Sequence, residues 1–357
     1  MRNGMNIAGV SEMVHEVQTQ PEEAIYRYGA VARWDEGRGI RAHNEPAVLG
    51  TVKSPRRYEV AVADEQGPTR GDAPTAVRLA LTALGACALT TFVGGGSARG
   101  VTLEYLRLGI SAERIRDEVS DRLTDLVYEL AVRADSGGVD IAEVVASMEQ
   151  QSPNHRTLTD PQPLTLVLGA SADPSAAAHP QPVSEPAPAP YEPAARPGET
   201  VGATVDWQYS VQFLADGDPA PLRVDQPKQL AGVDWGPNPQ EYLLMALASC
   251  VLGRTVALSA QQGRPAHSWR VRATGQVDIR GLFLIGPDPV VPVHRLTLEV
   301  TPLDAAGTGA EGWQDLVREA VRRSPVAGLL TSGHLVKVNL DAGTEPAPDA
   351  RTERAHD

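Results

Sequence analysis

Cysteine is almost absent from this chain of 357 residues, which contains only Cys87 and Cys250. The two lie far apart in the sequence, and neither belongs to a CxxC motif. They can therefore build neither a disulfide framework nor a cysteine zinc site. We expect no bound metal, no cofactor and no disulfide between these two residues. Each thiol needs its own explanation.

Basic residues are too few to balance the acidic ones, with 32 against 45 and a net charge of -13. This excess would repel a phosphate backbone or an anionic membrane surface, so we expect no nucleic acid and no membrane partner. No segment has about 18 consecutive uncharged apolar residues, and the N-terminus lacks a basic patch followed by an apolar core. These absences predict a cytoplasmic protein. The composition, 42% hydrophobic and 22% charged, is that of a globular chain long enough for two domains.

Proline and alanine dominate the segment 171–200, which cannot bury apolar surface and is predicted to be an extended linker. The segment 342–357 has the same character and is predicted to be a disordered tail. The remaining chain divides into an N-terminal extension (1–25), a first half (26–170) and a second half (201–341).

The two halves repeat the same landmarks in the same order. Pro74 and Pro237 each precede a cysteine by thirteen residues, and Gly100 and Gly263 each follow one by thirteen. Two further pairs of segments match: "LTALGACAL" (81–89) with "LMALASCVL" (244–252), and "SPNHRTLT" (152–159) with "SPVAGLLT" (324–331). Such repetition indicates a duplication.

Each half has the pattern of an opening hairpin, a long apolar helix with the cysteine, a strand pair, an amphipathic helix and a closing strand. This pattern predicts an α+β unit with an antiparallel sheet around a buried helix. We expect the two units to pack against each other as a pseudo-dimer within one chain.

The second long helix has a clear start. Asn238 suits the N-cap, Pro239 the first helical position, and Glu241 the third position of a capping box. The residues that follow are apolar nearly all round, which is typical of a central core helix. Cys250 is therefore predicted to be buried, where a free cysteine commonly acts as a small inert hydrophobe. The cysteine at the same helix position in both halves favours a function instead.

A family resemblance rests on "GPNPQEYLLMALASC" followed by "GQVDIRG" and "SPVAGLLT", and on "ALGAC" followed by "SPNHRTLTDP". These segments resemble the OsmC/Ohr family, named for osmotically inducible protein C and organic hydroperoxide resistance protein. The resemblance covers about 26–168 and 205–340. It implies a fused form of a dimer that has its active sites at the subunit interface.

The family chemistry implied is thiol-dependent reduction of organic hydroperoxides, in which a thiolate is oxidised to sulfenic acid and a second cysteine then forms a disulfide with it. Cys250 and Cys87 match the attacking cysteine, but Ser324 and Ser152 occupy the position of the second one. A serine cannot form that disulfide, so the resemblance implies a one-cysteine cycle with an external thiol reductant.

In the family, an Arg and a Glu hold the cysteine as thiolate and orient the peroxide. Arg38, in "DEGRG", matches the Arg, and the second half has no counterpart there. Glu241 lies near the Glu position, which in the hydroperoxide-resistance branch falls one residue earlier, at Gln240. A buried thiol needs a cation to ionise near neutral pH. We therefore predict a composite site of Cys250, Glu241 and Arg38, with Cys250 the more reactive thiol.

The substrate-binding residues expected from the same segments are Ser324, Ser152, His155 and Gln240. The leading functional hypothesis is a peroxidase acting on organic hydroperoxides. Two alternatives stay open: a duplicated fold recruited as a tailoring enzyme for a small organic substrate in specialised metabolism, or a non-catalytic protein that binds a hydrophobic small molecule. Fold alone does not decide among them.

Overall fold

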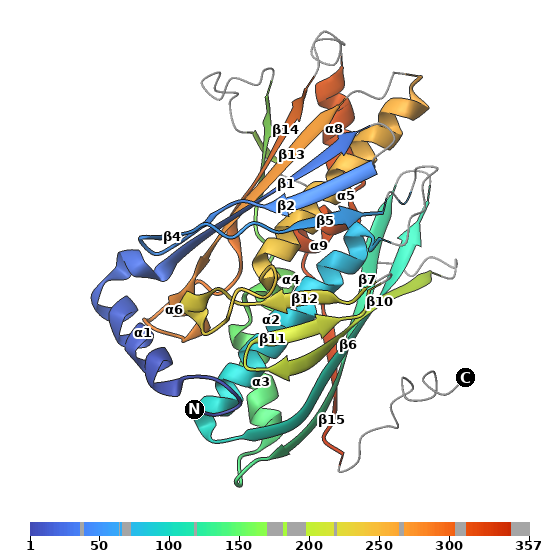
Figure 1. Ribbon diagram of the computed structural model, residues 1–357. Helices are drawn as coiled ribbons and strands as arrows, with labels where there is room; N and C mark the ends of the chain where they lie inside the picture. Colours follow the sequence, from blue (N-terminus) through green and yellow to red (C-terminus); the bar gives the residue numbers. More distant parts are fainter. Residues whose placement is uncertain are drawn as a thin grey trace.

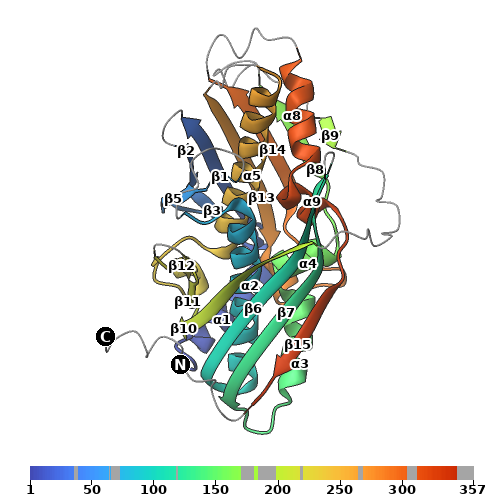
Figure 2. The same cartoon turned by 90° about the vertical axis from the view of Figure 1, so that its right-hand side faces the viewer.

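The computed structural model describes residues 1–35, 39–63, 65, 73–117, 120–169, 181–183, 198–217, 220–263, 268–303 and 312–343. It has two β-sheets with two long helices between them (Figure 1, Figure 2). The helices are α1 (Ile7–Thr19), η1 (Pro21–Ala24), α2 (Ala76–Arg99), α3 (Ile141–Gln151), α4 (Pro153–Thr159), η2 (Lys228–Leu230), α5 (Pro239–Gln261), α6 (Ile279–Leu282), α8 (Trp313–Arg322) and α9 (Pro325–Thr331).

The first sheet has the order β4-β3-β1-β13-β14-β8-β9, with β2 paired to β1 and β5 paired to β2. It contains β1 (Ile25–Asp35), β2 (Gly39–Asn44), β3 (Ala47–Leu49), β4 (Val52–Ser54), β5 (Glu59–Val62), β8 (Leu164–Leu168), β9 (Gln181–Val183), β13 (Trp269–Asp278) and β14 (His294–Pro302). Its pairs are antiparallel except β8 with β14, which are parallel.

The second sheet has the order β12-β11-β10-β6-β7-β15. It contains β6 (Thr102–Arg116), β7 (Asp121–Asp135), β10 (Glu199–Tyr209), β11 (Gln212–Ala215), β12 (Leu222–Asp225) and β15 (Val336–Asp341). Here β15 pairs parallel with β7, and the other pairs are antiparallel.

Both sheets combine strands from the two halves. The opening strand β1 of the first half pairs with β13 of the second, and β10 of the second half pairs with β6 of the first. The α+β class and the two-unit packing are confirmed. We expected each unit to form a sheet of its own strands, but each sheet contains strands from both units. Because the halves exchange their opening and closing strands, the chain forms one interlocked body.

The helices α2 and α5 form the centre of the molecule. They contact each other; α2 packs on β6 and β10, and α5 packs on β1, β2 and β13. By length and composition both could cross a membrane, but 89% and 78% of their most apolar windows are buried inside the protein. They are the core helices that the sequence pattern predicts. The capping box at Asn238 and Glu241 is formed as expected, and Gly100 ends α2 in the left-handed conformation with φ of 104°.

The N-terminal extension contains α1, which is capped by the Asn6 side chain and contacts η1 and α6. Within the predicted linker, Gln181–Val183 form strand β9 on the edge of the first sheet, and β10 already begins at Glu199. The rest of the linker between 170 and 197, and residues 344–357 of the predicted tail, lie outside the described residues.

Candidate thiol site between the two halves

Cys87 lies on α2 with 3% of its surface exposed. Its sulfur accepts three hydrogen bonds: from Ser152 Oγ at 3.3 Å, from the backbone N–H of Asn154 at 3.5 Å and from Gln240 Nε2 at 3.4 Å. Ser152 and Asn154 belong to the first half, whereas Gln240 lies in the first turn of α5 in the second half. The site is therefore shared between the halves, as the family resemblance implies for a dimer interface.

Local structure explains these donors. Ser152 is the N-cap of α4 and Pro153 its first residue, so the free N–H of Asn154 at the helix start points to the sulfur. The Asn154 side chain donates to the carbonyl oxygens of Ala83 at 3.0 Å and Pro239 at 3.3 Å. It thereby ties α2 to the start of α5. Sequence reasoning selected Ser152 but missed Asn154, whose role depends on contacts distant in sequence.

The Cys87 thiol is protonated near neutral pH, because burial raises its pKa above the ordinary value of 9.0 and the three donors only partly oppose this effect. Among the residues that the structure describes, only neutral groups donate to this sulfur. Such donors stabilise a thiolate once it forms, but they do not replace a guanidinium.

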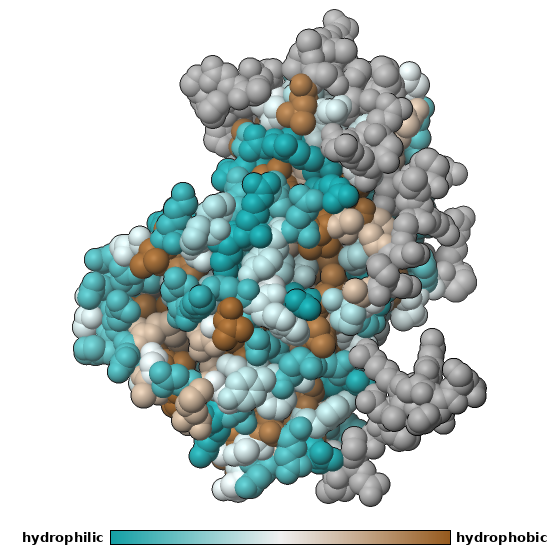
Figure 3. Space-filling view, viewed as in Figure 1, coloured by the Kyte–Doolittle hydropathy of each residue, from teal (hydrophilic) through white to brown (hydrophobic). Residues whose placement is uncertain are grey.

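A cavity of about 720 Å³ opens beside Cys87. It is lined by α1, α2, the end of β13 with α6, and the loop that contains η2, so both halves and the N-terminal extension contribute. Apolar side chains predominate, among them Met13, Tyr28, Val277 and Phe283. The volume suits a drug-sized organic molecule. Figure 3 shows apolar residues at the surface over α1 and its neighbours, in the part of the molecule that holds this cavity.

The surroundings of Cys250 resemble those of Cys87 but provide fewer hydrogen-bond donors among the described residues. Ser324 and the backbone amide of Val326 face its sulfur, as Ser152 and Asn154 face that of Cys87, yet burial raises the pKa of Cys250 to about 11. The position in α2 that corresponds to Gln240 is Val77, which has no donor to offer. Within the described residues, Cys250 thus has no counterpart of the hydrogen bond that Gln240 donates to Cys87.

A buried ion-pair network lies close to Cys250. The Arg114 guanidinium makes paired hydrogen bonds to Glu65, at 2.8 and 2.6 Å, and to Asp121, both at 2.8 Å. Arg254 also bonds Asp121. For Cys250, Arg114 lowers and Glu65 raises the pKa, so the network gives the thiol little net stabilisation of its charge.

The two thiols also differ in open space. Arg254 follows Cys250 by four residues, as Thr91 follows Cys87, and Thr91 lines the large cavity. Arg254 instead lines a smaller cavity of about 420 Å³ with charged walls, and Cys250 is not among the described residues that line it. Of the two thiols, Cys87 is the one that lines the apolar cavity.

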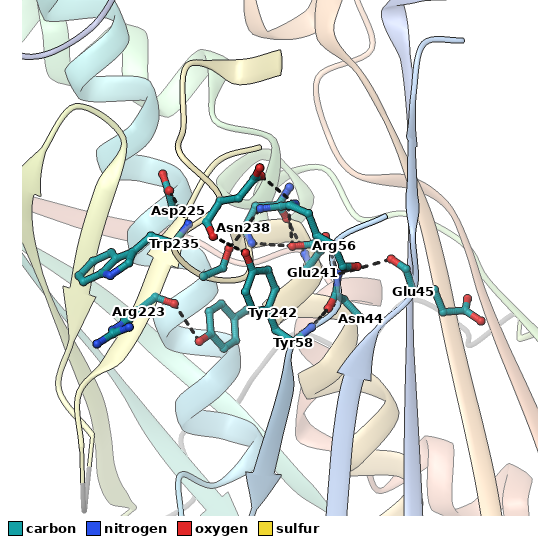
Figure 4. Close-up of polar contacts among 12 residues, drawn as sticks. Asn44, Glu45, Arg56, Tyr58, Arg223, Asp225, Trp235, Asn238, Glu241 and Tyr242 are labelled. Carbon is teal, nitrogen blue, oxygen red and sulfur yellow. Dashed lines mark hydrogen bonds and ion pairs between the residues drawn. The ribbon is translucent and has the colours of Figure 1, made fainter. Parts of the chain in front are cut away.

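Glu241 is fully buried at the start of α5, and burial raises its pKa. Its carboxylate accepts hydrogen bonds from Arg56 Nη2 at 2.9 Å, from Asn44 Nδ2 at 2.9 Å and from the backbone N–H of Asn238 at 2.7 Å (Figure 4). Because Arg56 and Asn44 belong to the first half, this ion pair holds the two halves together.

The predicted grouping of Glu241 with Cys250 is not formed. They lie nine positions apart on one continuous helix, which is about 13 Å along its axis. The carboxylate instead meets Arg56, beside the end of α5 that carries Gln240. Arg38 lies outside the described residues. Sequence reasoning missed Arg56, which lies between β4 and β5 and has no motif around it.

Further contacts fix the loop that leads into α5 (Figure 4). The Asp225 carboxylate accepts hydrogen bonds from the backbone N–H groups of Val233 at 3.0 Å and Trp235 at 2.8 Å. Tyr58 of the first half donates through its hydroxyl to the Asp234 carbonyl oxygen. This loop contains η2 and forms part of the cavity wall.

His155, expected to bind substrate, is not among the residues that line the cavity. Its ring packs edge-on against Tyr128 with 5.6 Å between centroids, and burial lowers its pKa to about 4. It is therefore neutral near pH 7. Within the described residues, no group of three His, Cys, Asp or Glu side chains is arranged to hold a metal ion.

A comparison with family models matches the OsmC-like protein family at residues 69–167 and 231–339, together more than half of the chain. The comparison with curated proteins gave no match. Each matched segment contains one core helix with its cysteine and the short helix that faces it. The chain therefore belongs to the OsmC-like family, with two family units in one polypeptide.

Proposed function

We propose that the protein is a one-cysteine thiol peroxidase in which Cys87 reduces an organic hydroperoxide held in the apolar cavity. The observation that carries this proposal is the convergence of three hydrogen-bond donors on the Cys87 sulfur beside a cavity of about 720 Å³. Among the described residues, no counterpart of Gln240 donates to Cys250, and Cys250 does not line the apolar cavity, so we assign the reaction to Cys87.

In the proposed reaction, the Cys87 thiolate attacks the terminal oxygen of the hydroperoxide. An S–O bond forms, the O–O bond breaks, and the leaving alkoxide takes up a proton to give the alcohol. Cys87 becomes a sulfenic acid. Ser152 Oγ, the Asn154 N–H and Gln240 Nε2 are placed to stabilise the negative charge on sulfur before the attack.

Ser152 stands beside Cys87 where the two-cysteine members of the family have their second thiol, so the sulfenic acid needs an external reductant. One small thiol condenses with it, which releases water and leaves a mixed disulfide. A second thiol then attacks the mixed disulfide, which regenerates Cys87 and releases the oxidised reductant as its disulfide.

A second candidate is a non-catalytic protein that binds an apolar small molecule in the same cavity. The raised pKa of both thiols favours it, because a protonated thiol attacks a peroxide slowly. The two candidates share the ligand site and differ only in whether Cys87 reacts.

Intact-protein mass spectrometry after one equivalent of cumene hydroperoxide separates them. We expect one added oxygen in the parent protein and in Cys250→Ser, and none in Cys87→Ser. Peptide mapping then places the oxygen on Cys87. Binding of cumyl alcohol without oxidation of Cys87 would favour the non-catalytic candidate, and oxidation confined to Cys250 would reject the assignment to Cys87.

A further inference from the structure

We propose that the smaller cavity, of about 420 Å³, binds the phosphate group of a small phosphate ester. Arg116, Arg254 and Arg323 line this cavity, and we call it the arginine cavity. The inference goes beyond the proposed reaction of Cys87 and does not depend on it.

The arginine cavity lies at the place on α5 that corresponds to the place of the apolar cavity on α2. On each core helix, the residues four, eight and eleven positions after the cysteine line a cavity. In α2 these residues are Thr91, Gly95 and Ala98, and in α5 they are Arg254, Leu258 and Gln261. The two cavities are therefore equivalent parts of the duplicated unit.

Three neutral residues of the apolar cavity have arginine as their counterpart in the arginine cavity. The pairs are Thr91 with Arg254, Gln151 with Arg323, and Ile279 with Arg116. The second pair directly precedes Ser152 and Ser324, and the members of the third pair each lie 29 residues after the cysteine of their own half. Arginine at all three positions indicates that this copy of the cavity has become a site for a negatively charged ligand.

The guanidinium groups lie close together, since three of them converge on one carboxylate oxygen, Asp121 Oδ2. The nitrogen atoms that pair with it are Arg114 Nη2 at 2.8 Å, Arg116 Nε at 3.4 Å and Arg254 Nη2. Burial is the main cause that lowers the pKa of Arg254 to about 10, and the positive charges of neighbouring arginines add to it. An anion placed among these groups would reduce their mutual repulsion.

Positive charge predominates at the wall of the arginine cavity. The described residues that line it include three arginines and two aspartates, Asp117 and Asp121. The side chains of Arg116, Arg323 and Arg254 are 42%, 27% and 13% exposed, whereas that of Asp121 is 4% exposed. A ligand in the cavity therefore meets the arginines more readily than Asp121, the carboxylate that they surround.

The arrangement suits a phosphate better than a carboxylate. Arg116 ends β6, Arg254 lies in α5 and Arg323 directly follows α8, so three elements supply the donors. A phosphate monoester carries about two negative charges and three acceptor oxygens, which can meet donors from several directions. A carboxylate has two oxygens in one plane and suits a single guanidinium fork. The volume leaves room for an organic group beside the phosphate.

The test compares two ligands that share a phenyl ring. Isothermal titration calorimetry of the full chain near pH 7.5 measures the affinity for phenyl phosphate and for benzoate. We expect phenyl phosphate to bind about tenfold more tightly than benzoate, because it can accept from more than one guanidinium. Arg254→Gln should weaken binding of phenyl phosphate about tenfold, the loss expected for a hydrogen bond to a charged group.

Arg322→Gln is the matched control and should leave the affinity unchanged. It removes one positive charge from the end of α8, where Arg322 pairs with Glu319 and is not among the described residues that line the arginine cavity. Arg323→Gln should also weaken binding, and it replaces Arg254→Gln if loss of the ion pair with Asp121 prevents folding. Failure of the parent protein to bind phenyl phosphate would overturn the inference, as would equal affinity for benzoate or an unchanged affinity in the Arg254 and Arg323 variants.

Discussion

Gln240 of the second half donates a hydrogen bond to the Cys87 sulfur of the first half, with 3.4 Å between Nε2 and Sγ. The same Nε2 atom lies 3.4 Å from Asn154 Oδ1, so the amide bridges the thiol and the residue that ties α2 to α5. A glutamine at this place supplies a donor without a charge. The thiol environment therefore depends on how the two halves pack.

Replacing Gln240 by Leu should slow alkylation of Cys87. Loss of one donor to the thiolate, worth about 1 kcal/mol, raises the pKa of Cys87 by about 0.7 unit and lowers the rate at pH 8 about fivefold. Site-resolved mass spectrometry with iodoacetamide measures both thiols in one sample. Cys250, which Gln240 does not contact, serves as the internal control. An unchanged Cys87 rate would show that this hydrogen bond does not influence the thiol.

The reactivity of both thiols should still increase above pH 9. Burial raises the pKa of Cys87 above 9.0 and that of Cys250 to about 11, so the thiolate fraction of each grows with pH in this range. Alkylation rates measured between pH 7 and pH 10 should rise for both residues, with the Cys250 rate showing no plateau. A plateau near pH 7 at either thiol would reveal a cation that stabilises it.

Cys250 should also make the folded state less stable in alkali. Its pKa is higher in the folded protein than the ordinary 9.0, so the unfolded chain loses the proton first, and stability present below pH 9 is lost as pH rises toward 11. We expect the free energy of unfolding of Cys250→Ala to fall less steeply over this window than that of the parent protein. Urea unfolding at pH 8, 9 and 10 measures the difference, and parallel curves would contradict it.

Local features of the chain were predictable from the sequence. The capping box at Asn238 and Glu241, the burial of both cysteine helices and the repeat of landmarks depend on residues close together, and the family resemblance added the place of Ser152 beside Cys87. The pairing of β1 with β13 was not predictable in this way, because alternating strands give no sign of which half they will join. The contact between Arg56 and Glu241 was not predictable either, because only the exchange of strands between the halves brings these two residues together.

Helix geometry alone excludes the predicted grouping of Glu241 with Cys250. Two residues nine positions apart on a helix are separated by about 13 Å, so Glu241 cannot serve Cys250 of its own helix. The adjacent Gln240 instead donates a hydrogen bond to Cys87 of the other half. In a protein of two packed units, the start of one core helix lies next to the middle of the other.

The ion pair between Arg56 and Glu241 should contribute strongly to the joining of the halves. Arg56→Met leaves a buried carboxylate without its cation and should cost about 3 kcal/mol in the free energy of unfolding. Glu241→Gln alone should cost less, because an amide oxygen can still accept from Asn44 and the Asn238 N–H. The double variant Arg56→Met with Glu241→Gln should be more stable than the sum of the single losses predicts. Urea unfolding of the four proteins gives the coupling, and additive losses would show that the two side chains act independently.

Thr91→Arg should close the Cys87 cavity. Thr91 is buried and lines the cavity, and the corresponding residue four positions after Cys250 is Arg254, whose side chain lies beside a smaller, charged cavity. An arginine at position 91 fills part of the apolar space and brings a charge, and the described residues that line this cavity include no carboxylate that could pair with it as Asp121 pairs with Arg254. We expect binding of 2-naphthol to weaken at least tenfold and alkylation of Cys87 to slow, while alkylation of Cys250 stays the same. Thr91→Val, which keeps the volume of the side chain, is the control and should retain probe binding; circular dichroism confirms that both variants fold. Unchanged binding in Thr91→Arg would mean that the probe occupies another site and that the space beside Cys87 does not receive the ligand.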